Sequence, residues 1–311
     1  MIKLPSASCK GFYRVEVLRP DGSVKSDIEF PNLITTAGIA RIWTNFGEFS
    51  YYCVAGTGTT PPQVTDSALV NEVMRIGSGT YTDLRQSSTA PFYHQSQAVF
   101  TFAAAKQNYT IGELGVCNVS GNVTLSSRAL PRDTGGNVTT ISVLTGEILR
   151  VTYILRMYFD MNKYEGSFEA NGVTYNYVAM ADRMDSAQYW HLANGYSWNP
   201  DSSGCSFEQR PADTTWANVG TINQNLSKAA EQTYNYNPTA TNSGPTQTVK
   251  LVAALANANF PKGINVIHVG YAKGNYRSGP SYAILLDKYM PKTADMTLEF
   301  EIDVTLRANV P

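Results

Sequence analysis

The stretch FYRVEVLRPDGSVKSDIEF, residues 12–30, alternates apolar and polar side chains on both sides of Pro20-Asp21-Gly22. Successive side chains of a β-strand point to opposite faces, so each arm of this stretch would bury one face and expose the other. Proline, aspartate and glycine between the arms supply the chemistry of a tight turn. The stretch therefore predicts an antiparallel β-hairpin within a mainly β fold.

The residues after this hairpin predict one short helix and then a series of strands. In NLITTAGIARIWTNF, residues 32–46, Thr35 or Thr36 can cap a helix, and apolar side chains follow at helical spacing. Short polar gaps then separate strands expected at residues 51–55, 96–103, 111–118, 123–130, 139–144 and 148–157.

The middle of the chain has a different composition. A second hairpin is expected to turn at Asn171-Gly172, a short helix is expected at 186–193, and a stretch rich in Asn, Thr, Trp and Pro follows. Strands are expected again at residues 248–254, 264–271, 282–289 and 296–307. We interpret the chain as an N-terminal β-sandwich module (1–160), a loop-rich insertion with a hairpin and a short helix (161–245), and C-terminal strands that form a second, partly duplicated module (246–311).

The later strands resemble the earlier ones in the same order. QAVFTFAAA from Gln97 parallels QTVKLVAAL from Gln247, and IGELGV from Ile111 parallels VIHVGY from Val266. We interpret this as a degenerate internal repeat. The expected fold class is mainly β, with two related antiparallel β-sandwich-like modules, short helices and a loop-rich central insertion.

Charge and cysteine usage argue against several classes of partner. The 24 Lys and Arg residues nearly cancel the 25 Asp and Glu residues, and no block of like charge stands out, so we expect no nucleic-acid partner. No apolar run approaches the ~18 residues that span a bilayer, and the start lacks the apolar core of a signal peptide. We therefore expect no membrane insertion and synthesis in a cytoplasm. The four cysteines form no CxxC pair, so we expect reduced thiols and no metal.

The segment YYCVAGTGTTPPQVTDSALVNEV, residues 51–73, invites comparison with a phosphate-binding loop. It lacks the Lys-Ser/Thr of a Walker loop and the third glycine of a dinucleotide loop, and Pro61 and Pro62 remove N–H donors that an anion would need. The alternative is that Gly56 and Gly58 supply turn conformations and that Thr65 or Asp66 caps a short helix over SALVNEV.

No arrangement of residues predicts catalysis. His94, His191 and His268 are far apart, Asp182 with Asp185 fits a helix N-terminus better than a cation site, and Glu113 with Glu147 is a weak candidate for a glycosidase pair. No GxSxG elbow occurs either. We expect no enzyme, no cofactor and no catalytic or metal site.

Aromatic residues of the middle segment are the remaining candidates for a site. Tyr189, Trp190, Trp198 and Trp216 lie among Asn, Ser and Asp residues. Such aromatics either anchor protein interfaces, stack on sugars or form a small core. These aromatics can form either a small core or a contact surface, and both interpretations are kept. If they form a contact surface, we favour a contact with another subunit over binding of a glycan.

Three stretches together resemble one family: Asn32-Leu33-Ile34-Thr35 before a glycine-containing helix, AGTGTTPPQVTDSALVNEV, and the run IGELGV…LSSRALPR…GEILRVTYILRM. In this combination they are similar to bacteriophage tail-associated virion proteins of baseplates, collars and fibre attachment points. The resemblance covers about residues 12–159. The second copy departs from it, because His268 replaces Glu113 and Arg128 has no clear equivalent.

The resemblance implies a structural component of a phage virion, most simply in the tail (baseplate, collar or neck, or fibre attachment), that acts by subunit assembly. Its partners would be other virion proteins and copies of itself, and its location the virion, assembled in the host cytoplasm. The alternative is a carbohydrate- or host-receptor-binding module on the tail, with a host-surface glycan as partner.

Overall fold

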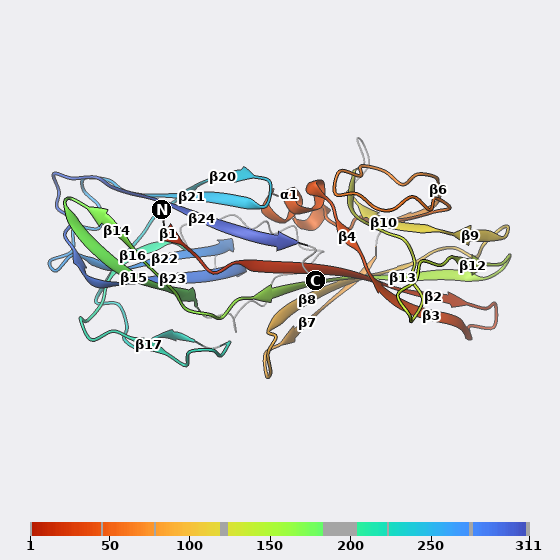
Figure 1. Cartoon of the computed structure of the whole chain (residues 1–311), viewed down its shortest axis with the longest axis horizontal. Helices are drawn as coiled ribbons and strands as arrows, with labels where there is room; N and C mark the ends of the chain where they lie inside the picture. Colours follow the sequence, from red (N-terminus) through yellow and green to blue (C-terminus); the bar gives the residue numbers. More distant parts are fainter. Residues whose placement is uncertain are drawn as a thin grey trace.

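The computed structural model describes residues 2–44, 46–77, 79–118, 124–182, 204–222, 224–273 and 276–308. The molecule is elongated, with the N-terminal half of the chain at one end and the C-terminal half at the other (Figure 1). Two long strands, β2 and β13, run from the middle of the molecule into the half that also holds β3, β10 and β12, whereas the N-terminus itself lies beside β24 in the other half. None of the helices within the described ranges is long and apolar enough to cross a membrane.

One nine-stranded sheet extends through both halves. Its strands are β1 (Ile2–Lys3), β2 (Ala7–Leu18), β3 (Val24–Pro31), β7 (Thr80–Gln86), β8 (Tyr93–Thr101), β13 (Ile148–Phe159), β20 (Thr239–Ser243), β21 (Thr246–Ala253) and β24 (Leu298–Ala308). The order is β20-β21-β24-β2-β13-β8-β7, with β3 paired to β2 and β1 to β24. The two halves join where Ala7, Ser8 and Cys9 of β2 pair in parallel with the end of β24.

A second sheet completes the first module. It has the order β4-β11-β10-β5-β6, formed by β4 (Leu33–Ile34), β5 (Tyr52–Gly56), β6 (Glu72–Gly77), β10 (Glu113–Cys117) and β11 (Leu125–Ala129). A two-stranded ladder of β9 (Tyr109–Ile111) and β12 (Ile141–Val143), the helix α1 (Thr36–Thr44) and a short 3-10 turn η1 (Phe46–Glu48) accompany it.

The expected hairpin and helix are both present. β2 and β3 pair antiparallel, and the turn is closed by Gly22 at φ 84° and by Asp21 Oδ1, which accepts the Ser23 N–H at 2.9 Å. Thr35 is the N-cap of α1, since its Oγ1 accepts the Gly38 N–H at 3.0 Å. The helix buries Ile42 and Trp43 completely.

Gly38 lets α1 approach strand β11 closely. A Cβ at this position would collide with the backbone carbonyl oxygen of Ser126. Backbone cannot move aside as easily as the end of a flexible side chain. The glycine of the motif is therefore required by packing, although it is a poor helix former.

We expect Gly38→Ala to lower the free energy of unfolding by about 1–3 kcal/mol, the usual cost of overpacking a core. Helix propensity alone predicts the opposite sign, a gain of roughly 1 kcal/mol. Urea unfolding followed by circular dichroism measures the change. Thr44→Ala, at the exposed end of the same helix, is the matched control and should shift stability by less than about 0.5 kcal/mol. A stabilised Gly38→Ala protein would contradict the close packing.

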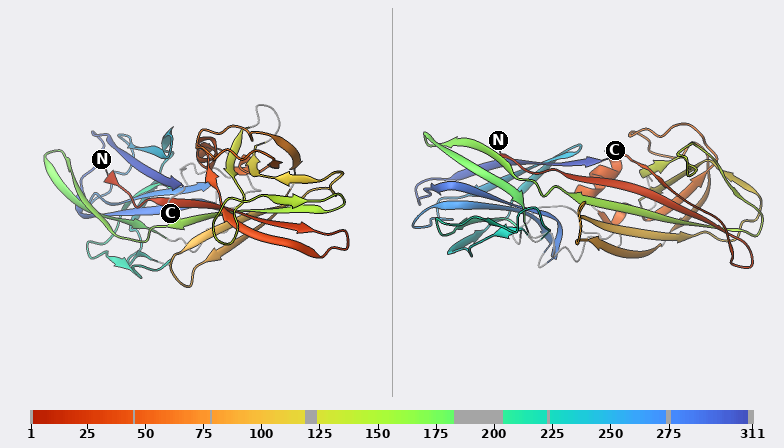
Figure 2. Two further views of the ribbon diagram at one scale, coloured as in Figure 1. Left: turned by 45° about the vertical axis from the view of Figure 1, so that its right-hand side comes forward. Right: turned by 60° about the horizontal axis from the view of Figure 1, so that its bottom comes forward.

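A six-stranded sheet completes the second module, at the end of the long sheet that holds β20, β21 and β24. Its order is β14-β15-β23-β22-β16-β19, formed by β14 (Tyr164–Ala170), β15 (Val173–Ala181), β16 (Ser206–Gln209), β19 (Gln232–Asn235), β22 (Ile264–Lys273) and β23 (Tyr276–Met290). A small ladder of β17 (Trp216–Ala217) and β18 (Asn225–Leu226) lies in the connection from β16 to β19. Figure 2 shows the two modules end to end from two further directions.

The two modules use the same strand-pairing scheme. In the first, β8 pairs with β7 and β13 in one sheet, and β10 pairs with β11 and β5 in the other. In the second, β21 pairs with β20 and β24, and β22 pairs with β23 and β16. These strands contain the segments that resemble one another in sequence. The expected fold class, mainly β with two related sandwich-like modules, is confirmed.

The middle of the chain is integrated into the second module. Strands from residues 161–245 lie in the six-stranded sheet beside β22 and β23, and β20 extends the long sheet. The hairpin at Asn171-Gly172 is present, with positive φ angles of 52° and 75° at its two turn residues. The helix expected at 186–193 lies outside the described residues.

Candidate functional site

The Gly-Thr-Gly loop of the first module does hold an anion, and that anion is the protein's own Glu113. The Glu113 side chain is fully buried and accepts backbone N–H groups from Gly58 (3.1 Å), Val70 (3.1 Å) and Asn71 (2.8 Å). Arg128 donates to the same carboxylate from Nε (3.0 Å) and Nη2 (2.8 Å). The loop is thus fixed on the sheet by a buried ion pair.

Two expectations about this loop are wrong. Gly56 and Gly58 do not have positive φ angles; they are needed because a Cβ on either would collide with the Glu113 carboxylate. No helix forms over SALVNEV: residues 67–71 form bends and irregular backbone that lead into β6. In a helix the N–H groups of Val70 and Asn71 would donate to backbone carbonyl oxygens four residues earlier. Here both donate to the Glu113 carboxylate.

The equivalent position of the second module holds His268. Glu113 in β10 lies opposite Gly56 of β5, and His268 in β22 lies opposite Ser206 of β16. His268 Nδ1 is 3.7 Å from an Asp182 carboxylate oxygen, and His268 Nε2 is 3.4 Å from a Glu208 carboxylate oxygen. The imidazole therefore lies between two carboxylates, one at each ring nitrogen.

Further contacts tie this cluster to the connection after β16. Arg210 Nε donates to Glu208 Oε2 at 2.6 Å, and Ser206 Oγ donates to Glu208 Oε1 at 3.2 Å. Tyr289 Oη donates to the Arg210 carbonyl oxygen at 2.6 Å. The cluster thus fastens the start of the 210–231 connection, as Glu113 fastens the Gly-Thr-Gly loop.

The environment of Glu208 changes its acidity. Burial alone would raise the pKa of this carboxyl, but hydrogen bonding and charge from His268, with smaller contributions from Arg210, outweigh it and lower the pKa to about 2. Glu208 is therefore ionised near neutral pH. A shifted carboxyl beside a histidine is a common feature of functional sites, although structural ion pairs produce it as well.

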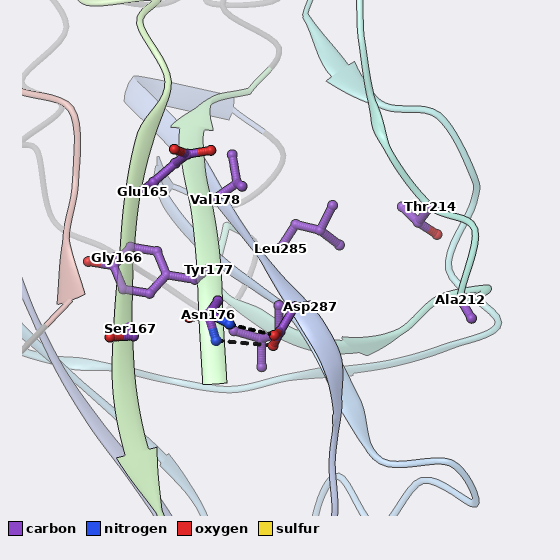
Figure 3. A pocket seen from close by; sticks show the side chains of 11 residues that line it. Glu165, Gly166, Ser167, Asn176, Tyr177, Val178, Ala212, Thr214, Leu285 and Asp287 are labelled. Carbon is purple, nitrogen blue, oxygen red and sulfur yellow. Dashed lines mark hydrogen bonds between the residues drawn. The ribbon is translucent and has the colours of Figure 1, made fainter. Parts of the chain in front are cut away.

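A pocket of about 560 Å³ lies on the same face of the six-stranded sheet (Figure 3). The pocket and the His268 cluster share this face because of the strand register. Glu165, Val178, Leu285 and Val266 lie side by side on four neighbouring strands. Val266 is two residues from His268 on β22, and residues two apart on a strand point to the same face. The lining comes from four elements: Glu165, Gly166 and Ser167 of β14, Asn176, Tyr177 and Val178 of β15, Leu285, Leu286 and Asp287 of β23, and Ala212 and Thr214 before β17.

Asp287 is the most firmly oriented acidic group of the pocket. Its two carboxylate oxygens accept the Asn176 N–H at 3.0 Å and the Asn176 Nδ2 at 2.8 Å, as the dashed lines in Figure 3 show. Glu165, at the other end of the pocket, contacts Lys163. Oxygen acceptors beside the aliphatic side chains of Val178 and Leu285 suit a polar, uncharged or cationic ligand.

Of the aromatic residues singled out from the sequence, the structure places Trp216. It is half-buried in β17 and packs against a small cluster of Leu226, Val266 and Ala283 on the outer face of the sheet. Tyr189, Trp190 and Trp198 lie outside the described residues, as do Asp185 and His191. Trp216 thus helps to cover the sheet beside the pocket.

The other sequence candidates are not brought together. Glu147 accepts the Leu144 N–H and a Lys25 ammonium, each at 2.8 Å, whereas Glu113 is bonded to Arg128. His94 is buried in β8. Within the described ranges, no three His, Cys, Asp or Glu side chains are grouped as metal ligands would be.

Sequence reasoning missed Glu208, Arg210 and Asp287. The signal available for the first two was the alternation of Ser206, Glu208 and Arg210 in a short strand and the residue directly after it. Comparisons with protein-family models, with curated protein sequences and with solved structures found no match.

Proposed function

We propose that this chain is a structural component of a bacteriophage virion, located in the tail, and that it works by binding neighbouring subunits and not by catalysis. The observation that carries the proposal is the nine-stranded sheet that continues through both modules. A single hydrogen-bonded sheet makes the two sandwiches one elongated body, and such a body suits a spacer or attachment element in a particle.

The residues on which the family resemblance rests have structural roles in the first module. Thr35 caps α1, Gly38 admits the helix to β11, and Glu113 with Arg128 fixes the Gly-Thr-Gly loop. These roles give a physical reason for the motifs to occur together. They support a shared module, and the tail assignment follows from that resemblance.

The test is to produce phage particles that carry an affinity-tagged copy of this chain and to separate heads from tails. We expect the tagged chain in the tail fraction at a fixed stoichiometry, resistant to high-salt washing. Electron microscopy with a label on the tag would then give its position. Intact particles that lack the chain altogether would overturn the proposal.

The second candidate function is binding of a host-surface glycan or receptor. The observation that favours it is the pocket with its fixed Asp287 carboxylate. Asp287→Asn should weaken retention on immobilised host-envelope polysaccharide by about tenfold or more, since a bond to a charged acceptor is lost. Thr248→Ala, on the other sheet, is the control. Trp216→Ala is less informative, because Trp216 also packs on the sheet.

A further inference from the structure

The long sheet carries an aromatic and cationic cluster where β2, β13 and β8 run side by side. Arg156 of β13 lies opposite Lys10 of β2 and Gln95 of β8, and Tyr158 lies opposite Tyr93. All of these side chains are half-buried, in contrast to the buried residues that alternate with them. They therefore lie on the outer face of the sheet, away from the core.

Arg156 is held rigidly in this cluster. Its guanidinium carbon lies 4.8 Å from the centre of the Phe12 ring and 5.2 Å from the centre of the Tyr93 ring. Its Nε donates to Gln95 Oε1 at 2.8 Å. Aromatic rings attract a guanidinium electrostatically, and these contacts hold the Arg156 side chain in one conformation. The side chain therefore loses little conformational entropy when a ligand binds.

Arg156 differs from the neighbouring arginines in having no carboxylate partner among the described residues. On the same face, Arg14 binds Asp27 and Arg150 binds Glu16, each through two nitrogens. Within the described part of the chain, no Asp or Glu lies within ion-pair distance of Arg156 or of Lys10. Among the described residues, the two terminal nitrogens of Arg156 thus have no hydrogen-bond acceptor and form a fork of N–H donors on the outer face of the sheet.

We propose that this cluster, formed by Lys10, Phe12, Tyr93, Gln95, Arg156 and Tyr158, docks an acidic segment of a different protein subunit in the particle. An Asp or Glu carboxylate of that segment is bound by the terminal nitrogens of Arg156, and apolar neighbours of the carboxylate pack on Phe12 and the two tyrosines. The partner assignment rests on the proposed function; the chemistry of the cluster does not.

The rest of the face selects against a polyanion. Beyond Phe12 the arginines of this face are already paired, Arg14 with Asp27 and Arg150 with Glu16, and Glu29 adds a negative charge. This part of the face therefore gives a chain of phosphates no row of cations to bind. A single carboxylate flanked by apolar groups matches a patch with a rigid arginine, two tyrosines and a phenylalanine. Arginine and tyrosine are also the residue types that dominate binding energy at protein interfaces.

The first test uses the full chain and two synthetic peptides, acetyl-Thr-Val-Glu-Val-Thr-amide and its Gln counterpart, titrated by NMR. We expect the Glu peptide to shift the Arg156 Nε–H resonance and to bind about tenfold more tightly than the Gln peptide. Arg156→Gln should remove this preference, and Arg14→Gln, a paired arginine of the same face, should retain it. Equal binding of both peptides to the native protein overturns the proposal.

The second test separates the docking surface from the virion assignment. Tagged particles are grown with native, Arg156→Gln or Arg14→Gln chain, and occupancy is measured by mass spectrometry. Loss of the Arg156→Gln chain alone supports docking in the particle; equal occupancy of all three overturns it while leaving the proposed function intact. Absence of every form, with Glu-peptide selectivity present, overturns the function only. Arg156-dependent self-association in sedimentation would instead identify the partner as a second copy and overturn the assignment to a different subunit.

Discussion

Replacing Arg128 by Met is expected to lower the free energy of unfolding of the first module by about 3–5 kcal/mol, as for other buried ion pairs that lose one partner. The Arg128 side chain is 2% exposed and Glu113 is fully buried, so solvent cannot take over the role of the lost guanidinium. Arg128 also binds Asp66 at 2.7 Å and the Thr60 carbonyl oxygen at 2.9 Å. The substitution therefore leaves one buried charge and two loop contacts without their partner.

Fluorescence of Trp43 measures this effect in the first module. Trp43 is buried in α1, and the other three tryptophans, Trp190, Trp198 and Trp216, can be replaced by Phe so that urea unfolding reports on one site. Arg75→Met is the matched control, because the Arg75 side chain is 35% exposed and pairs with Glu72 at the surface. That control should cost less than about 1 kcal/mol.

A double substitution tests the reason for the loss. Glu113→Leu combined with Arg128→Met removes both charges, so the double variant should lose less stability than the sum of the two single variants. The Gly58, Val70 and Asn71 N–H groups then lack an acceptor, which keeps the double variant below the native protein. Strict additivity would show that the buried pair does not couple.

Local patterns in the sequence predicted much of the fold. The two hairpins follow from alternation around Pro20-Asp21-Gly22 and Asn171-Gly172, because period and turn chemistry are properties of adjacent residues. The cap at Thr35 is equally local. The repeated order of similar strands predicted two related modules, and the two modules do share one pairing scheme.

Contacts between distant residues account for what the sequence did not predict. The reason for Gly56 and Gly58 is a carboxylate 55 residues after Gly58, so no local rule could assign it. The same holds for the helix expected over SALVNEV, which loses its N–H groups to Glu113. The Arg156 cluster is equally nonlocal, because Arg156 lies on β13 whereas the two rings beside it and its hydrogen-bond acceptor come from β2 and β8.

The two modules fix corresponding connections to their sheets with different side chains. In each, a charged or ionisable side chain in the central strand of a sheet fastens the connection that follows the neighbouring strand. Glu113 does so with Arg128 and backbone N–H groups, and His268 does so with Glu208, Asp182 and, through Glu208, Arg210. Because the second arrangement depends on a carboxylate with a shifted pKa, its contribution to stability must depend on pH.

We expect ionised Glu208 to stabilise the second module by roughly 3 kcal/mol near neutral pH, from its pKa of about 2 and an ordinary value of 4.5. Below its ordinary pKa the unfolded chain binds a proton that the folded chain excludes. The stabilisation is therefore complete above about pH 4.5 and is lost as the pH falls toward 2. Urea unfolding between about pH 2 and 6, followed by the fluorescence of Trp216 with the other tryptophans replaced by Phe, measures it.

Comparison with Glu208→Gln isolates this carboxyl from the others that titrate in the same range. The difference in unfolding free energy between native protein and variant should shrink by roughly 3 kcal/mol as the pH falls from 6 to about 2, since a protonated Glu and a Gln are alike in charge. Glu299→Gln is the control, because the Glu299 side chain is 47% exposed and its surface pair with Lys250 contributes little. If the native protein and Glu208→Gln differ by the same amount at every pH, the ionised Glu208 does not hold the 210–231 connection, and the fastening falls to His268 and Tyr289.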